Sequence, residues 1–117
     1  MNVKKIIATL SDTYPGKKII KNYEENPTEI ICEIEPSESH PEYSVALAVI
    51  DQYDSHYHLY SVKTYPVIHG TLIVLIGNKE ITLNAGDELV ILPKTVHGAQ
   101  GDETIVKVSS KPGWIIF

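Results

Sequence analysis

The stretch DSHYHLYSVKTYPVIHG, residues 54–70, contains the residues on which the fold assignment depends. His56 and His58 stand two positions apart, and side chains at i and i+2 of a β-strand leave the same face of a sheet. Two imidazoles on one face can bind a single metal ion. So short a pattern also arises by chance, or as two polar side chains on a solvent face, and it decides nothing alone.

Around this stretch, short runs of apolar and polar residues alternate, which predicts β-strands. The predicted strands cover residues 29–35, 43–51, 71–76, 80–83, 88–92 and 104–109. Residues 3–10 show a helical repeat instead, and Pro15 and Gly16 signal the turn that ends this short helix. Many short strands with almost no helix indicate an antiparallel barrel or sandwich.

Two of the predicted strands differ in their side-chain pattern. In residues 29–35, EIICEIE, one face carries Ile30, Cys32 and Ile34 and the other carries mostly carboxylates. This alternation predicts a half-buried strand. Residues 43–51 are apolar on both faces and rich in β-branched side chains, which predicts a central strand.

Length and composition limit the possible functions. The chain has 117 residues, the size of one domain, and a net charge of −5 with scattered lysines, so we expect no nucleic-acid partner. The longest apolar runs are too short to span a bilayer, and the first residues contain no secretory signal. Cys32 is the only cysteine, which excludes an internal disulfide and fits a reducing compartment. We therefore expect a cytoplasmic protein without a membrane partner.

The histidine pair belongs to a longer pattern. The pattern consists of His56, His58, Lys63 and Gly70, followed by Gly86, Asp87, Pro93 and His97. It resembles the paired motifs of the cupin family, with Lys63 where the family has a Glu ligand and Lys94 or Thr95 where a turn glycine is usual. The resemblance covers about residues 27–114, including EYSVALAVID (42–51) and VKVSSKPGW (106–114), which are similar to small single-domain cupins of the sugar-isomerase-like type.

The cupin resemblance implies an all-β fold, namely an antiparallel double-stranded β-helix (jelly-roll) barrel with a short N-terminal helix. Residues 1–117 would form a single domain, with an N-terminal extension over residues 1–26 and a barrel core over about residues 27–114. The resemblance also implies that His56, His58 and His97 line the barrel interior. There they would bind a divalent transition metal such as Zn, Mn, Fe or Ni.

Lys63 is the main departure from the cupin motif. A protonated lysine 4 Å from a dication is repelled by roughly 8 kcal/mol at an effective dielectric near 20. Lys63 could lose its proton, turn away from a three-histidine site, or occupy the ion's position in a metal-free pocket. It could also anchor a substrate carboxylate or phosphate, or form a Schiff base with a carbonyl, unless its ammonium simply reaches the barrel mouth or an acidic neighbour.

Four tyrosines surround the expected site: Tyr53, Tyr57, Tyr60 and Tyr65. Strand parity puts Tyr65 on the same face as Lys63, and a tyrosine hydroxyl can donate a proton or bind a hydroxyl-rich ligand. Aromatic side chains also pack in strands without any chemical role. We take Lys63 and Tyr65 as the candidate catalytic residues.

Three functions remain open from the sequence. The protein could be a metal-dependent enzyme on a small polar metabolite, such as a sugar phosphate or organic acid. It could be a non-catalytic module that binds a small anion or sugar in a metal-free pocket, or a metal-independent enzyme with a histidine base. A homodimer is expected, because barrels of this family commonly pair through edge strands and the apolar residues 114–117 need a partner surface.

Overall fold

The computed structural model describes residues 1–36 and 41–113. Its elements are α1 (Val3–Thr13), β1 (Lys18–Asn22), β2 (Glu29–Glu35), β3 (Ser44–His56), β4 (Val62–His69), β5 (Thr71–Ile76), β6 (Lys79–Asn84), β7 (Glu88–Ile91) and β8 (His97–Lys111). The apolar cluster expected at residues 114–117 lies outside the described residues, and the homodimer stays a prediction. In the described part of the chain, no helix combines the length and the apolar character needed to cross a membrane.

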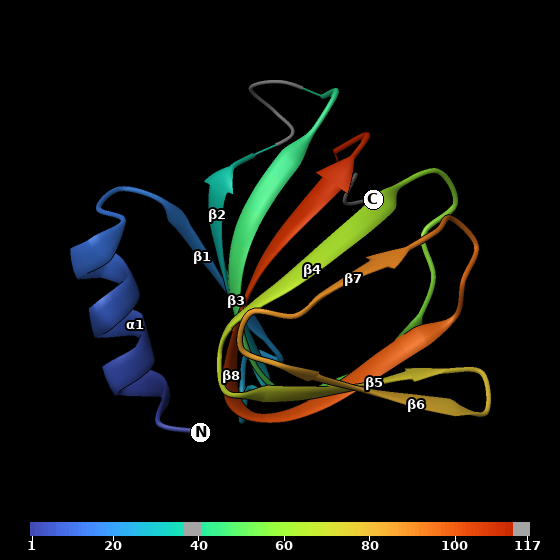
Figure 1. Cartoon of the computed structure of the whole chain (residues 1–117). Coiled ribbons are helices and arrows are strands. Elements are labelled where there is room, and N and C mark those ends of the chain that lie inside the picture. The colour runs from blue at the N-terminus through green and yellow to red at the C-terminus, as the bar shows by residue number, and fades with distance from the viewer. Residues whose placement is uncertain (37–40, 114–117) are drawn as a thin grey trace.

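All strand pairings are antiparallel, and two long strands connect the layers of the fold. One run of the sheet has the order β1-β2-β3-β8-β4-β7, and the β5–β6 hairpin joins it through β8. The N-terminal part of β8 pairs with β5, whereas its C-terminal part pairs with β4, and β3 follows β8 along both parts. The sheet therefore curls into an open β-barrel, with the β5–β6 hairpin across one side (Figure 1).

Most predicted strands are confirmed, and the differences arise from pairing. β2 and β5 have the predicted bounds, whereas β3 and β8 are longer than predicted. Residues 97–103 of β8 contain two glycines and no alternation, yet they are extended because they lie between β3 and β5. Sequence reasoning missed β1. Its sequence has no clear strand pattern, and it is extended because it pairs with β2 at the edge of the sheet.

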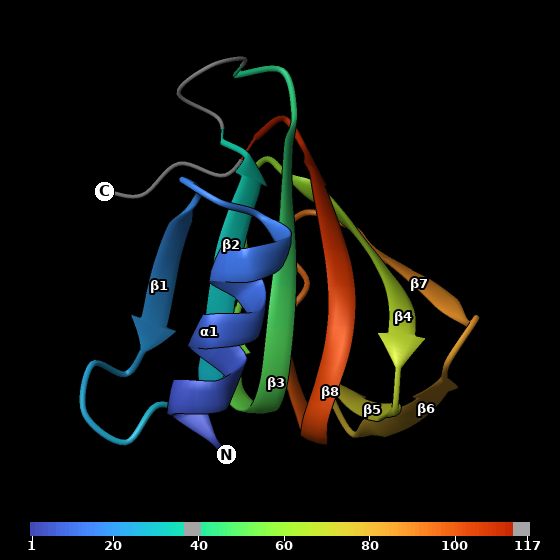
Figure 2. The ribbon, with the colours of Figure 1, turned by 90° about the vertical axis from the view of Figure 1, so that its left-hand side faces the viewer.

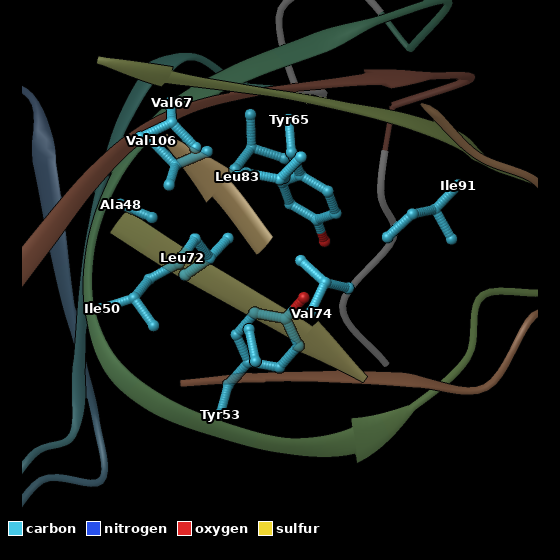
Figure 3. Close-up of a cluster of buried hydrophobic side chains, with 12 residues drawn as sticks. Ala48, Ile50, Tyr53, Tyr65, Val67, Leu72, Val74, Leu83, Ile91 and Val106 are labelled. Atoms are coloured by element: carbon cyan, nitrogen blue, oxygen red, sulfur yellow. The ribbon is translucent and has the colours of Figure 1, made fainter. Parts of the chain in front are cut away.

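The described residues form two hydrophobic cores, one on each side of the curled sheet. Outside the barrel, Ile6 and Leu10 of α1 pack on Ile30 and Cys32 of β2 and on Leu47 of β3. In Figure 2, the helix accordingly covers the face of β2 and β3. Inside the barrel, a second cluster is formed by side chains from β3 to β8, shown in Figure 3. Because α1 covers its apolar face, β2 turns its other face, which carries Glu29, toward the barrel interior.

The point where β8 changes partners is tightly packed. The Thr104 hydroxyl donates a hydrogen bond to the Thr71 carbonyl at 2.6 Å. A Cβ atom added at Gly101 would lie 2.5 Å from Thr104 Oγ1 and 2.9 Å from the Ile50 carbonyl oxygen. The second of these atoms belongs to the backbone and cannot rotate away. Gly101 therefore lets the backbone of β8 lie close to Ile50 of β3 and to the Thr104 side chain of its own strand.

Gly101→Ala is expected to destabilise the fold by about 1–3 kcal/mol, because the added methyl group forces a backbone shift in a close-packed region. The measurement is the free energy of unfolding in urea. The control is Lys107→Ala in the same strand, where the side chain is exposed and the expected change is within about 0.5 kcal/mol. Equal stability of the two variants would show that the bend tolerates a side chain.

Candidate metal centre and its cavity

The three candidate ligands come from two adjacent strands and one loop. His56 is the last residue of β3 and is the register partner of His97, the first residue of β8. His58 follows in the loop, so the expectation that both histidines of the pair lie on one strand is wrong. His58 is held beside the other two because its carbonyl accepts a hydrogen bond from the Lys94 backbone N–H at 2.7 Å.

The three imidazoles converge. One ring nitrogen of each histidine lies within 4.8 Å of the corresponding nitrogens of the other two. The His56 and His97 ring centroids are 4.6 Å apart, and those of His56 and His58 are 4.9 Å apart. His97 is fully buried, His58 is half-buried and His56 is exposed. The cluster thus runs from the barrel interior to solvent.

Hydrogen bonds orient two of the rings. The Nδ1 atoms of His56 and His97 lie 2.8 Å from the backbone carbonyls of Asp54 and Thr95, respectively. A carbonyl can only accept, so in each neutral ring the proton is on Nδ1 and Nε2 carries the lone pair. This is the arrangement in which a backbone carbonyl holds a metal-binding histidine in the correct tautomer.

Burial favours the uncharged forms of His58 and His97. Burial, together with the nearby positive charge of Lys63, lowers the pKa of His58 from its ordinary 6.5 to about 4. Burial also lowers the pKa of His97, although the bond to the Thr95 carbonyl acts in the opposite direction. At neutral pH both imidazoles are therefore uncharged, which is the state that binds a metal.

The three histidines fit a divalent transition ion. The Nε2 atom of His58 is buried without a hydrogen-bond partner in the described structure. Three nitrogens that each lie 2.0–2.1 Å from one ion are about 3.3–3.6 Å apart, so nitrogens at the present limit of 4.8 Å would close by about 1.2–1.5 Å on binding it. His56 is exposed and has room to move. Three histidines that could hold a metal ion are therefore present.

Lys63 lies at the wall of the same cavity, with a carboxylate nearby. Lys63 belongs to β4 and is 7% exposed. Its side chain points into the barrel, as that of Tyr65 does, so the prediction that the two residues share a strand face is confirmed. Burial lowers the pKa of Lys63 from 10.5 to about 8, while the negative charge of Glu29 acts to raise it. The positive charge of Lys63 also lowers the pKa of His58 and His97, so Lys63 interacts electrostatically with these histidines as well as with Glu29.

Sequence reasoning missed Glu29. This residue begins β2, is 9% exposed, and accepts a hydrogen bond from the Asn22 side-chain amide at 3.3 Å. Burial raises the pKa of Glu29, whereas the Asn22 amide and the charge of Lys63 lower it. The carboxylate face of EIICEIE was the available signal, but it resembles an ordinary solvent-exposed face until the helix is known to cover the other one.

Two of the four tyrosines enter the barrel, and two do not. Tyr53 and Tyr65 are buried and point their hydroxyls toward each other from opposite walls (Figure 3). The Tyr65 hydroxyl lies 3.4 Å from His97 Nε2, to which it can donate because that nitrogen carries the lone pair. Burial raises the pKa of both phenols, so both remain protonated at neutral pH. Tyr57 and Tyr60 are exposed.

The side chains of the site that point into the barrel line a cavity of about 550 Å³. Its polar groups include His56, His58, Lys63, Tyr65 and Glu29. The remaining wall is largely apolar and is formed by Ile20, Ile31, Ala46, Ala48 and Val108. A mainly apolar cavity of this size with a few convergent polar groups is typical of a site for a small molecule.

The turn residues of the cupin-like pattern have the expected backbone. Gly70 and Gly86 have φ values of +89° and +95°, a region that favours glycine. Of Lys94 and Thr95, the two residues where a turn glycine is usual, Lys94 takes the left-handed conformation, with a φ of +65°.

No protein-family model and no curated protein matches this sequence. Solved structures with a similar fold include Streptomyces PAC13, a nucleoside dehydratase, in a variant with uridine (TM-score 0.74, 13% identity, covering 87% of this chain and 80% of that one). They also include KdgF from Halomonas sp. (TM-score 0.67, 18% identity, 80% and 93%). A third is an RmlC-like cupin from Shewanella frigidimarina (TM-score 0.68, 18% identity, 83% and 85%). These likenesses show a shared fold.

The lowered pKa values of His58 and His97 predict how stability depends on pH. Between about pH 4 and 6.5 the unfolded chain binds protons at these histidines that the folded chain does not, so the free energy of unfolding should rise with pH across this range. His58→Gln should flatten the rise, whereas His69→Gln, at an exposed histidine, should leave the slope unchanged. The measurement is urea unfolding at several pH values on metal-free protein. An identical slope in all three proteins would contradict a neutral, desolvated His58.

Proposed function

We propose that this protein, whose chain has the cupin fold, is a metal-dependent enzyme that acts on a small polar metabolite. His56, His58 and His97 would hold the divalent transition ion. The observation that carries the proposal is the convergence of three ring nitrogens, two of them fixed as lone-pair donors by carbonyl bonds and the third buried without a partner. A buried nitrogen without a hydrogen-bond partner lowers the stability of the folded protein unless a ligand binds to it.

Each side chain around the histidines has a distinct role in this proposal. When bound, a divalent ion polarises a carbonyl or activates a water molecule. The Lys63 ammonium binds the carboxylate or phosphate of the substrate in a largely apolar cavity. The Tyr65 hydroxyl, which lines the same cavity and stays protonated at neutral pH, donates to a developing oxygen anion.

Glu29 explains how Lys63 is compatible with a nearby dication. A lysine forced against an ion would prevent binding, but Lys63 also interacts electrostatically with the Glu29 carboxylate. Its charge is thereby partly balanced, and its lowered pKa reduces the fraction that is charged. Of the three arrangements that the sequence left open, the proposal keeps the three-histidine site, with Lys63 beside it and partly balanced by Glu29.

The similar structures support enzyme chemistry in a barrel of this shape. One of them is a nucleoside dehydratase that was solved with uridine, a polar small molecule. At 12–13% identity the likeness concerns the fold, so the reaction and the substrate do not transfer. It is nevertheless consistent with a small polar ligand in the cavity of this protein.

The second candidate is a non-catalytic pocket that binds a small anion or sugar without a metal. The specific observation in its favour is the contact between the Tyr65 hydroxyl and His97 Nε2, which gives that nitrogen a partner of its own. In this case Lys63 takes over the ion's positive charge. Ligand-induced stabilisation without turnover and without bound metal would favour this candidate.

Metal binding should stabilise the native protein. With zinc or manganese at about 100 times the dissociation constant, the expected gain is about 2.7 kcal/mol, seen as a rise in melting temperature. His97→Ala should lose the gain, whereas His69→Ala should keep it. Equal melting of the wild-type protein with and without zinc, manganese, iron and nickel would overturn the metal proposal.

Replacing Lys63 separates its charge from its size. Lys63→Met removes the positive charge with little change in volume and should strengthen metal binding about tenfold, and Lys63→Glu, which adds a carboxylate ligand, should strengthen it further. The measurement is the dissociation constant for zinc by calorimetry, with Lys94→Met as the control. Unchanged affinity in both Lys63 variants would mean that its ammonium does not act on the metal site.

A further inference from the structure

Glu29 lines the cavity from β2, a strand that carries none of the three histidines. Its side chain lines the cavity with Asn22 of β1, while Lys63 approaches from β4. Among the groups of His, Cys, Asp and Glu that could hold an ion in the described chain, the one found contains the histidines and not Glu29. Glu29 is therefore a separate polar feature of the same cavity.

A carboxylate is an expensive choice for this position. Moving an ionised carboxylate out of water costs several kcal/mol, and apolar pairs of similar volume are often as stable as a buried ion pair or more so. The neighbours on this wall, Ile31, Ala48 and Val108, are apolar. One amide hydrogen bond, 3.3 Å long, fixes Oε1 from Asn22. An apolar residue would meet the needs of packing alone.

We propose that Glu29, held in position by Asn22, is a specificity-determining residue that binds hydroxyl groups of a sugar-derived anionic substrate. The inference rests on the proposed function for one point only, which is that the substrate's anionic group lies at Lys63. The substrate class is then a polyhydroxylated small anion, such as a sugar phosphate or sugar acid.

The chemistry of a carboxylate explains this selection. An ionised carboxylate only accepts hydrogen bonds, so it favours a ligand that presents O–H or N–H donors and disfavours a second negative charge or an alkyl group. Lys63 only donates, so it selects the opposite kind of group. Because both residues line one cavity of about 550 Å³, the site offers a donor and an acceptor to the same ligand.

The test compares ligands that share a phosphate and differ in their hydroxyls. Ribose 5-phosphate and pentyl phosphate form one matched pair, and glucose 6-phosphate and hexyl phosphate form the other. In a largely apolar cavity the alkyl phosphates have the hydrophobic advantage, so a preference for the sugars requires hydroxyl recognition. Dissociation constants are measured by calorimetry on the full chain, both as purified and after metal loading, with metal content determined on the same samples.

The wild-type protein should bind at least one sugar phosphate about tenfold tighter than its alkyl partner. Glu29→Gln should reduce this ratio about tenfold, because hydrogen bonds to a charged group are stronger than those to an amide. The change also leaves Lys63 without its counter-charge, which strengthens phosphate binding for both ligands equally, so only the ratio is diagnostic. Glu33→Gln on the same strand removes the same charge outside the cavity wall and should keep the wild-type ratio.

A second variant covers the case in which Glu29→Gln does not fold. Asn22→Ala removes the amide that orients the carboxylate but keeps the Asn22 backbone carbonyl, which accepts a bond from the Thr28 N–H at 2.8 Å. It should lower the sugar-to-alkyl ratio by a smaller factor. The melting temperature of each variant verifies that it is folded at the temperature of the titration.

Two results would overturn the inference: a wild-type protein that does not prefer either sugar phosphate, or a ratio that is the same in wild type, Glu29→Gln and Asn22→Ala. The metal proposal fails separately. Protein that takes up no metal during loading but still shows a Glu29-dependent ratio would end the metal proposal and leave the sugar inference standing. Protein that binds metal but has a sugar-to-alkyl ratio independent of Glu29 would end the sugar inference and leave the metal proposal standing.

Discussion

The antiparallel ladder between β3 and β8 is the constraint on which the rest of the structure depends. Both strands are long, and β8 passes from β5 to β4 while it stays paired with β3, so this ladder connects the two parts of the barrel. The same register sets His56 opposite His97, at the end of β3 and the start of β8. The close approach at Gly101 and the Thr104 hydrogen bond fix the bend between these two parts. The site geometry is thus a consequence of one strand pairing.

The balance of buried charge is the second property that defines the site. His58 and His97 become neutral because they are desolvated and lie near a positive charge, whereas Lys63 keeps part of its charge because Glu29 lies near it. A cavity with Lys63 alone would repel a metal ion, and one with Glu29 alone would repel an anionic ligand. Together the two opposite charges partly balance each other inside the cavity.

Much of the fold and the identity of the three histidines could be predicted from the sequence, because each depends on local patterns. Alternation identified β2, an apolar run identified β5, and the spacing of the cupin-like motif singled out His97. The extent of β8 was not predictable, since pairing with its neighbours orders a glycine-containing run that has no strand pattern. Glu29 was missed for a similar reason: whether a carboxylate face meets solvent or a cavity depends on where α1 packs, and periodicity does not contain that information.

The central claim is that His56, His58 and His97 share one metal ion while Lys63 remains beside them. The most direct test is elemental analysis of purified, tag-free protein, expressed as moles of each transition metal per chain, before and after incubation with zinc, manganese, iron and nickel. The account predicts close to one equivalent of a divalent transition metal in the wild-type protein and a large loss in His56→Ala. Absence of metal from the wild-type protein after incubation with all four ions would contradict the account, and would leave Lys63 as the permanent cation of a metal-free pocket.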